Sequence, residues 1–218
     1  MWIDTHCHTK YSYDNWLEPR DLIIRARALG LAAVCVTEHH SFEVSEPVER
    51  VGREEGLLVL RGVEISTDRG HVLAYGVADD GWNIWGRNTY LPIVPVIERV
   101  VALGGICVPA HPYREIGVAS LLDDLFDLRG IAAVETHNGN NSDQDNDLAR
   151  AAADHLALPT LGGSDCHKMA AVGRCATDFL VPVTDIASFI DAVRAGACRG
   201  AYYPHFPLDA AVAAAVLT

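Results

Sequence analysis

The sequence predicts an α/β fold in which strands alternate with helices and the strands close into a barrel. Short apolar runs alternate with segments that carry apolar residues at helical spacing, an order typical of parallel sheets. Most of the apolar runs end in His, Asp or Glu, as strands do when their carboxyl ends surround one site. Because nearly every strand contributes to one site, a closed barrel is favoured over an open sheet.

The predicted strands are short, and each leads directly into polar residues. The first is the apolar lead-in 1–3, which is followed by His6 and His8. Side chains two apart on a strand point to the same side, so these two imidazoles can hold one ion. The later apolar runs, at 31–37, 57–63, 72–76, 105–110, 131–134 and 159–164, adjoin Glu38-His39-His40, Glu64, Gly70-His71, His111-Pro112, Glu135 to Gly139 and Asp165-Cys166-His167.

Between the strands, five segments have one apolar helical face. They span residues 19–29, 45–56, 91–103, 143–156 and 184–195, and we predict a helix for each. The Ala-rich end, 208–217, is too short to span a bilayer and is predicted to be a terminal helix. The longest irregular segment, 78–90, contains Trp82 and Trp85. Two tryptophans favour a packed loop, and a lid over the site is the alternative.

Length and composition indicate one globular domain. The chain has 218 residues, half of them apolar, which suffices for a large core. Its six cysteines include no C-x-x-C pair, which argues against a zinc ribbon. No apolar run approaches 18 residues and no basic-then-apolar leader precedes the first strand, so we expect a cytoplasmic protein without membrane contact. The sequence leaves the oligomeric state open.

The charge balance restricts the partners. A formal net charge of −12 disfavours long nucleic acids, because non-specific affinity for them rests on Lys and Arg. The two lysines, Lys10 and Lys168, both lie beside the polar motifs. A small anionic substrate stays compatible, because bound divalent ions would dominate the local field.

Taken together, the polar motifs resemble the PHP (polymerase and histidinol phosphatase) family. The resemblance implies one domain over residues 1–218, folded as a distorted seven-stranded β/α barrel with up to three metal ions at the carboxyl ends of the strands. It also leaves a helical extension at about 184–218. The motifs follow the family's order and spacing from residue 4 to about 177: Asp4 to Thr9, Ser12-Tyr13-Asp14, Thr37-Glu38-His39, Gly62-Val63-Glu64, Gly70-His71, His111-Pro112 and Gly163 to His167.

The resemblance also assigns nine ligands to two or three divalent ions. Mixed imidazole and carboxylate ligands suit zinc, manganese or iron. Every expected position carries a ligand-type residue, which argues against a metal-free member. The assignment is His6, His8, Glu64 and Asp165 for one ion; Glu64, His71 and His111 for a second, with Glu64 bridging; and Asp14, His39 and His167 for a third.

The family's activity implies a phosphoesterase for a small phosphorylated substrate, either a phosphomonoester or a small phosphodiester, nucleotides included. In this hypothesis a metal-bound hydroxide attacks phosphorus while the ions neutralise the developing charge. The catalytic candidates are Glu64, His111 and Asp165. Arg114 is the candidate phosphate clamp, since a guanidinium can grip two phosphate oxygens, and a surface salt bridge is its alternative.

Two positions depart from the family pattern. Glu38 replaces the usual Asp and is expected to alter the geometry around the ligands or to orient a ligand His. His137 stands where relatives carry an apolar or aromatic residue, which makes it a candidate pocket residue or, less favoured, a metal ligand. The other candidate pocket residues are His40, Lys10, Lys168 and Arg174.

Three other functions stay open at this point. One is a short-oligonucleotide exonuclease, and the acidic charge and the lack of a following polymerase weigh against longer DNA. Another is a non-catalytic, metal-binding regulatory protein. The third is an amidohydrolase, many of which bridge two metals with a carbamylated strand lysine, although neither lysine here ends a mid-chain strand. The short interval 114–133 leaves no room for a substrate-capping insertion and favours an open pocket.

Overall fold

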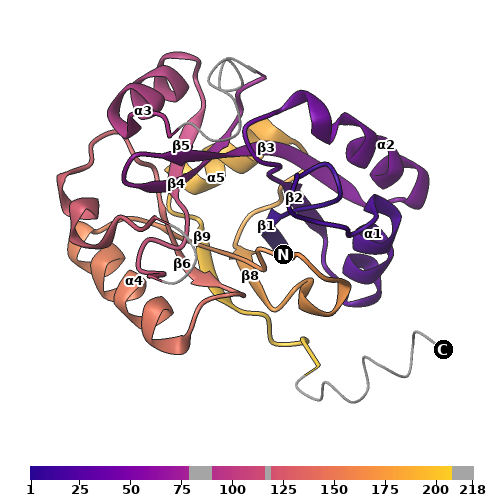
Figure 1. Ribbon diagram of the computed structural model, residues 1–218. Coiled ribbons are helices and arrows are strands. Elements are labelled where there is room, and N and C mark those ends of the chain that lie inside the picture. Colours follow the sequence, from indigo (N-terminus) through magenta and orange to yellow (C-terminus); the bar gives the residue numbers. More distant parts are fainter. Residues whose placement is uncertain (79–89, 116–118, 208–218) are drawn as a thin grey trace.

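Strands gather at the centre of the computed structural model and helices surround them (Figure 1). The structure describes residues 1–78, 90–115 and 119–207. The strands are β1 (Trp2–Cys7), β2 (Ala33–Val36), β3 (Leu58–Thr67), β4 (Gly70–Tyr75), β5 (Ile106–Pro109), β6 (Val134–Asn138), β7 (Thr160–Gly163), β8 (Cys175–Phe179) and β9 (Cys198–Tyr202). The helices are α1 (Pro19–Ala28), α2 (Glu46–Glu55), α3 (Ile93–Ala102), α4 (Asp143–Leu156) and α5 (Ile186–Arg194), with 3₁₀ turns at Glu43–Ser45, Leu122–Asp127 and Met169–Ala171.

The sheet curls, and a second, smaller sheet lies across its opening. The larger sheet has the order β5-β4-β3-β2-β1-β8-β9, and β6 pairs with β7. Isolated bridges join Cys107 on β5 to Ile131 before β6, and Cys7 on β1 to Cys166 after β7. The pair β6–β7 therefore lies between β5 and β1, and the whole is a mixed α/β fold with a curled, half-barrel sheet.

The helices agree with the prediction, whereas strand direction does not. All five predicted helices are present, within two residues of their predicted ends. The prediction of a parallel sheet is wrong for four strands, since only β1–β2–β3 and β6–β7 are parallel pairs. The chain turns from β3 into β4 through Asp68 and Arg69 alone, which forces an antiparallel hairpin. β5, β8 and β9 are also antiparallel to their neighbours.

The predicted helical extension at 184–218 is only partly helical. After α5 the chain forms β9, which pairs with β8 in the large sheet. Polar residues such as Thr177, Asp178 and Arg199 interrupt the apolar pattern of these two strands, which hides them in the sequence. The predicted terminal helix at 208–217 and the tryptophan-containing loop lie in 208–218 and 79–89, outside the described residues. Within the described parts, no helix combines the length and the apolar character needed to cross a bilayer.

The apolar core extends up to the strand segment that carries the first histidines. Phe189 on α5 packs on Tyr75 and Phe179, with ring centroids 4.9 and 5.3 Å apart. The Tyr75 hydroxyl donates a 2.6 Å hydrogen bond to the Thr5 carbonyl, one residue before His6. This packing anchors β1 where the polar site begins.

Two glycines let β7 approach β1 and β8 closely. A Cβ atom on Gly163 would lie 2.3 Å from the Cβ of His6, and one on Gly162 would lie 2.6 Å from the Ala176 carbonyl oxygen. Any larger residue would push the strands apart. The close approach brings the segment after β7 next to His6 and His8, and Asp165 donates its backbone N–H to the His6 carbonyl at 2.7 Å.

Candidate metal centre

The fold brings all nine predicted ligands into one cluster at the carboxyl ends of β1, β2, β3, β5 and β7 and the start of β4. Five of them are buried almost completely: His6, His8, Glu64, His111 and Asp165 are at most 2% exposed. The others are His71 on β4 and three residues in loops, namely Asp14, His39 and His167.

Glu64 lies at the centre of this cluster. Its Oε2 is 3.0 Å from His8 Nε2, 3.4 Å from His6 Nε2 and 3.2 Å from His39 Nδ1. Its Oε1 is 2.8 Å from His71 Nδ1 and 3.1 Å from His111 Nε2. One carboxylate oxygen therefore faces each of two groups of imidazoles, as a ligand shared between two ions must.

Two further carboxylates complete the cluster. Asp165 Oδ1 lies 3.4 Å from His8 Nε2 and 3.6 Å from His6 Nε2. Asp14 Oδ2 lies 3.3 Å from the Nε2 atoms of both His39 and His167. Within the described chain, three groups have donor atoms close enough together to hold an ion: His6, His8 and Glu64; Glu64, His71 and His111; and His8, His39 and His167. The third contains His8 where the sequence assignment has Asp14.

The chemistry of the donor atoms fits divalent cations. His6 Nε2 and His8 Nε2 lie only 3.0 Å apart, both facing carboxylate oxygens. Burial opposes charge on these imidazoles, but Glu135, Asp165 and Glu64 raise the pKa of His6 well above its usual value, and Asp165 and Glu64 raise that of His8 to about 10. The cluster is thus a site that demands positive charge. Divalent ions bound by nitrogen and oxygen ligands can supply it in place of protons.

Glu135 belongs to the site, although the sequence analysis did not select it. It is fully buried, and its Oε1 lies 2.8 Å from His6 Nδ1. Its Oε2 accepts hydrogen bonds from the His111 backbone N–H at 2.7 Å and from Asn138 Nδ2 at 3.0 Å. These contacts hold the His6 ring so that Nε2 faces the cluster. The missed signal was its position at the end of an apolar run, which it shares with the ligands.

Glu38 supports the loop that follows β1. Its carboxylate accepts hydrogen bonds from the Thr9 backbone N–H, the Thr9 hydroxyl and the Ser12 hydroxyl. Ser12 Oγ in turn lies 3.0 Å from His8 Nδ1. Glu38 therefore orients His8 through Ser12, and its longer side chain spans the distance from β2 to this loop.

Arg114 holds Asp165 and does not form a surface salt bridge. Its Nη2 donates to Asp165 Oδ2 and to Asn138 Oδ1, each at 2.6 Å, and its Nε donates to Asn141 Oδ1 at 2.8 Å. The Arg114 side chain is only 15% exposed. The guanidinium thus fixes the carboxylate oxygen of Asp165 that faces away from His6 and His8.

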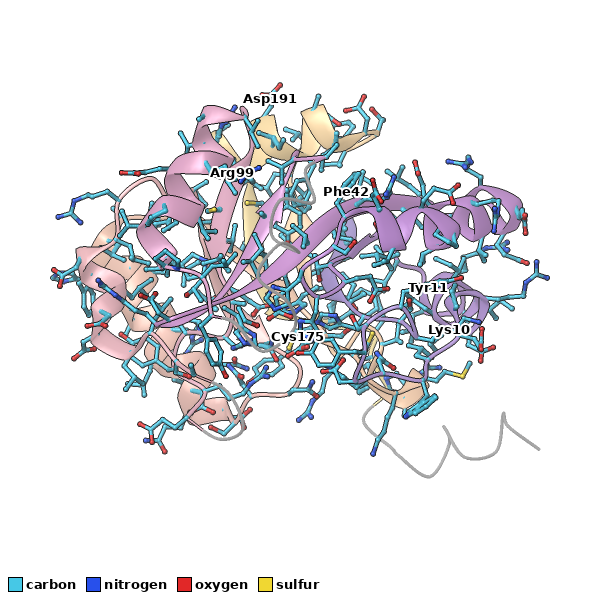
Figure 2. All side chains as sticks on the ribbon, turned by 45° about the horizontal axis from the view of Figure 1, so that its top comes forward. Lys10, Tyr11, Phe42, Arg99, Cys175 and Asp191 are labelled. Atoms are coloured by element: carbon cyan, nitrogen blue, oxygen red, sulfur yellow. The ribbon has the colours of Figure 1, made fainter. Side chains whose placement is uncertain are left out.

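The other candidate pocket residues are not part of the cluster. Lys10 pairs with Glu18 at 2.7 Å, on the α1 side of the molecule (Figure 2). The His137 ring packs edge-on against Tyr202, 5.2 Å between centroids, and does not reach the nine ligands. His137 was predicted from its place after β6, but the register of β6 shifts between Glu135 and His137. Lys168 and Arg174 line a separate pocket.

His40 is nearer to the cluster than these residues. It is 4% exposed, and its ring centroid lies 6.4 Å from that of His39. Its backbone N–H donates to the Glu64 carbonyl at 2.9 Å. Burial, with the neighbouring His39, lowers the pKa of His40 to about 4. His40 is therefore a neutral residue packed behind His39.

Comparison with known proteins agrees with this geometry. The family model "PHP domain" matches residues 4–169, and the model "PHP-associated" matches residues 143–198. An uncharacterised protein of Methanocaldococcus jannaschii is 29% identical over 153 residues, which cover 66% of this chain and 85% of that protein. A Thermotoga maritima protein named as a histidinol-phosphatase is 36% identical over 72 residues, 30% of this chain and 31% of that protein.

Solved structures agree on the fold. The crystal structure of PsfC from Pseudomonas syringae superposes with a TM-score of 0.71 at 21% sequence identity, covering 99% of this chain and 96% of that one. The family model spans well over half of the sequence, from the first histidines to the segment after β7. The chain therefore belongs to the PHP domain family.

Proposed function

We propose that this protein is a metal-dependent phosphoesterase that hydrolyses a small phosphorylated substrate, a phosphomonoester or small phosphodiester. The observation that carries the proposal is the Glu64 carboxylate, which presents one oxygen to each of two groups of imidazoles. Paired ions about 3.5–4 Å apart are the arrangement that phosphoester hydrolysis uses. The histidinol-phosphatase name of the Thermotoga maritima relative supports the same class of reaction.

In this proposal two to three ions of zinc, manganese or iron occupy the cluster, within a distorted barrel of the PHP type. His6, His8, Glu64 and Asp165 hold the first, Glu64, His71 and His111 the second, and Asp14, His39 and His167 the third. The distances within each group support this division, and the nearness of His8 to His39 and His167 makes His8 a second candidate for the third ion.

When bound, the ions supply the hydroxide nucleophile and neutralise the charge of the phosphoryl group. The chain's own residues prepare the site for them. Imidazoles around Glu64 and Asp165 outweigh burial and hold the pKa values of both carboxyls well below their usual range, so both stay ionised. Arg114 keeps Asp165 in place, and within the described chain its Nη1 donates no hydrogen bond. That group is free for a phosphate oxygen.

The test is metal content measured on the same sample as hydrolysis of a panel of phosphomonoesters and small phosphodiesters. About two to three ions per chain with turnover of a small substrate is the expected result. Preferred cleavage of short oligonucleotides would favour an exonuclease. A fully loaded but inert protein would favour a regulatory, metal-binding role. No bound metal after reconstitution would overturn the assignment of the ligands.

Metal uptake is expected to strengthen as pH rises. In the metal-free protein, carboxylates keep His8 protonated at neutral pH, with its pKa at about 10, and raise the pKa of His6 as well. A divalent ion binds the neutral imidazole, so it must displace these protons. The apparent affinity should therefore rise by up to about tenfold per pH unit for each proton released. Chelator competition at pH 6 and pH 8, with calorimetry in two buffers, measures both effects, and equal affinities at the two pH values would contradict the prediction.

Replacing Glu135 with glutamine is expected to weaken metal binding about 10- to 100-fold. The variant keeps the size of the side chain but removes the charge that faces His6 Nδ1 at 2.8 Å. Chelator competition measures the change, and Glu18→Gln, which removes a carboxylate paired with Lys10, is the matched control. An unchanged affinity would mean that the Glu135 contact does not support the ligand.

A further inference from the structure

A second pocket lies beside the candidate metal centre. Its volume is about 620 Å³, within the range of ligand-binding pockets. It is lined by Asp143, Lys168, Arg174, Tyr202, Tyr203 and Phe206, with two alanines of the 3₁₀ turn Met169–Ala171. None of these residues belongs to the nine candidate ligands.

The pocket opens at the same end of the barrel as the cluster. Lys168 directly follows the candidate ligand His167, and Asp143 begins α4 just after β6 ends. β8 runs antiparallel to β1, and β9 antiparallel to β8, so the start of β8 and the end of β9 lie where β1 ends. Arg174 and Tyr203 sit there, joined by a backbone hydrogen bond of 3.1 Å. A ligand bound at the cluster can thus extend into this pocket (Figure 1).

The pocket combines cationic side chains with aromatic rings. Lys168 and Arg174 are both exposed, and neither side chain forms an ion pair or hydrogen bond within the part of the chain that the structure describes. The other lysine, Lys10, is by contrast paired with Glu18. The one lining carboxylate, Asp143, accepts a 2.6 Å hydrogen bond from the Tyr202 hydroxyl. In a protein of net charge −12, two unpaired cations over a ring-lined pocket form a local site for an anion.

We propose that this pocket binds a second phosphate group of the substrate while the metal centre cleaves the first. The proposal rests on the phosphoesterase function above and specifies its substrate class, a molecule with two separated phosphates. Lys168 and Arg174 bind the second phosphate, and the rings of Tyr202, Tyr203 and Phe206 cover the part of the substrate between the two. The second phosphate belongs either to a bisphosphorylated small molecule or to the next nucleotide of a short oligonucleotide.

The kinetic test compares p-nitrophenyl phosphate, which has one phosphate, with fructose 1,6-bisphosphate and the dinucleotide pTpT. In Lys168→Gln and Arg174→Gln, KM for at least one two-phosphate substrate should rise about tenfold, with kcat unchanged. The parameters for p-nitrophenyl phosphate should stay as in the wild type, and Lys10→Gln is the matched control. An effect on fructose 1,6-bisphosphate alone indicates small molecules, and one on pTpT alone indicates oligonucleotides. Equal effects on all three substrates, or none, would overturn the proposal.

A binding measurement separates this proposal from the phosphoesterase function. Alkane-α,ω-bisphosphonates and the matching monophosphonates have carbon–phosphorus bonds that a phosphoesterase does not cleave. Calorimetry on the metal-loaded protein should find a bisphosphonate bound about tenfold more tightly than its monophosphonate, and Lys168→Gln/Arg174→Gln should abolish that difference. The difference without any phosphoester hydrolysis would retain the pocket and reject the enzyme function. No difference across the series would reject the pocket.

Discussion

Replacement of Asp165 by asparagine is expected to reduce phosphoesterase turnover by about 10³-fold or more while the fold survives. Its Oδ1 faces the Nε2 atoms of His6 and His8, and its Oδ2 accepts the Arg114 hydrogen bond. The amide of asparagine is a poor metal ligand, so charge stabilisation at the reacting phosphate is lost. Asp165 has a φ of 51°, a left-handed conformation that asparagine adopts readily and alanine does not. For that reason Asp165→Asn is a cleaner variant than Asp165→Ala.

Three measurements on the same preparation check this prediction: kcat/KM, metal content and thermal unfolding. His6→Ala should give a comparable loss, since His6 Nε2 faces both Glu64 and Asp165. Asp147→Asn is the control, because this α4 carboxylate is 65% exposed and pairs only with Arg150 on the same helix. A stable, metal-loaded Asp165→Asn protein with nearly normal turnover would remove Asp165 from the catalytic site.

Replacement of Gly200 by alanine is expected to destabilise the protein by about 3 kcal/mol. A Cβ atom at this position on β9 would lie 2.2 Å from the Leu161 carbonyl oxygen and 2.8 Å from the Gly162 nitrogen. Both are backbone atoms of β7, so no side-chain rotation relieves the clash. The strands would have to separate, and β7 carries the chain into Asp165 and His167.

Urea unfolding of Gly200→Ala against wild type measures this effect. The neighbouring Arg199→Ala is the matched control, because the Arg199 side chain is 72% exposed, and its replacement should cost less than about 0.5 kcal/mol. A Gly200→Ala protein with the wild-type midpoint would show that β9 can shift away from β7 freely. Activity should fall along with stability in this variant, since the displaced strand leads into the site.

The helices and the ligand residues were predictable because their signals are local. Helical periodicity needs only about a dozen consecutive residues, and a capping pair such as Ser142 and Asp145 marks the exact start of α4 in the sequence. His6 and His8 share a face because strand side chains alternate, whatever the rest of the fold does. That the motifs meet at one end of the sheet also followed, since each one ends or adjoins a strand.

Strand direction and the supporting contacts were not predictable in this way. An apolar run looks the same in a parallel and an antiparallel sheet, so β4, β5, β8 and β9 could not be oriented from composition. The Glu135–His6 contact joins residues 129 positions apart, and the Arg114–Asp165 pair joins residues 51 apart. No local pattern specifies which carboxylate faces which ring over such separations.

The sequence by itself therefore determined the helix positions, the set of candidate ligands and the family, because each depends on residue type and spacing. The tertiary structure alone decided that Glu64 lies between two groups of imidazoles, that Glu135 and Arg114 hold His6 and Asp165, and that His137 packs on Tyr202. It also decided that Lys168 and Arg174 share a pocket beside the site. The physical reason is that these relations are distances between segments far apart in the chain, which only the packing of β7, β8 and β9 against β1 sets.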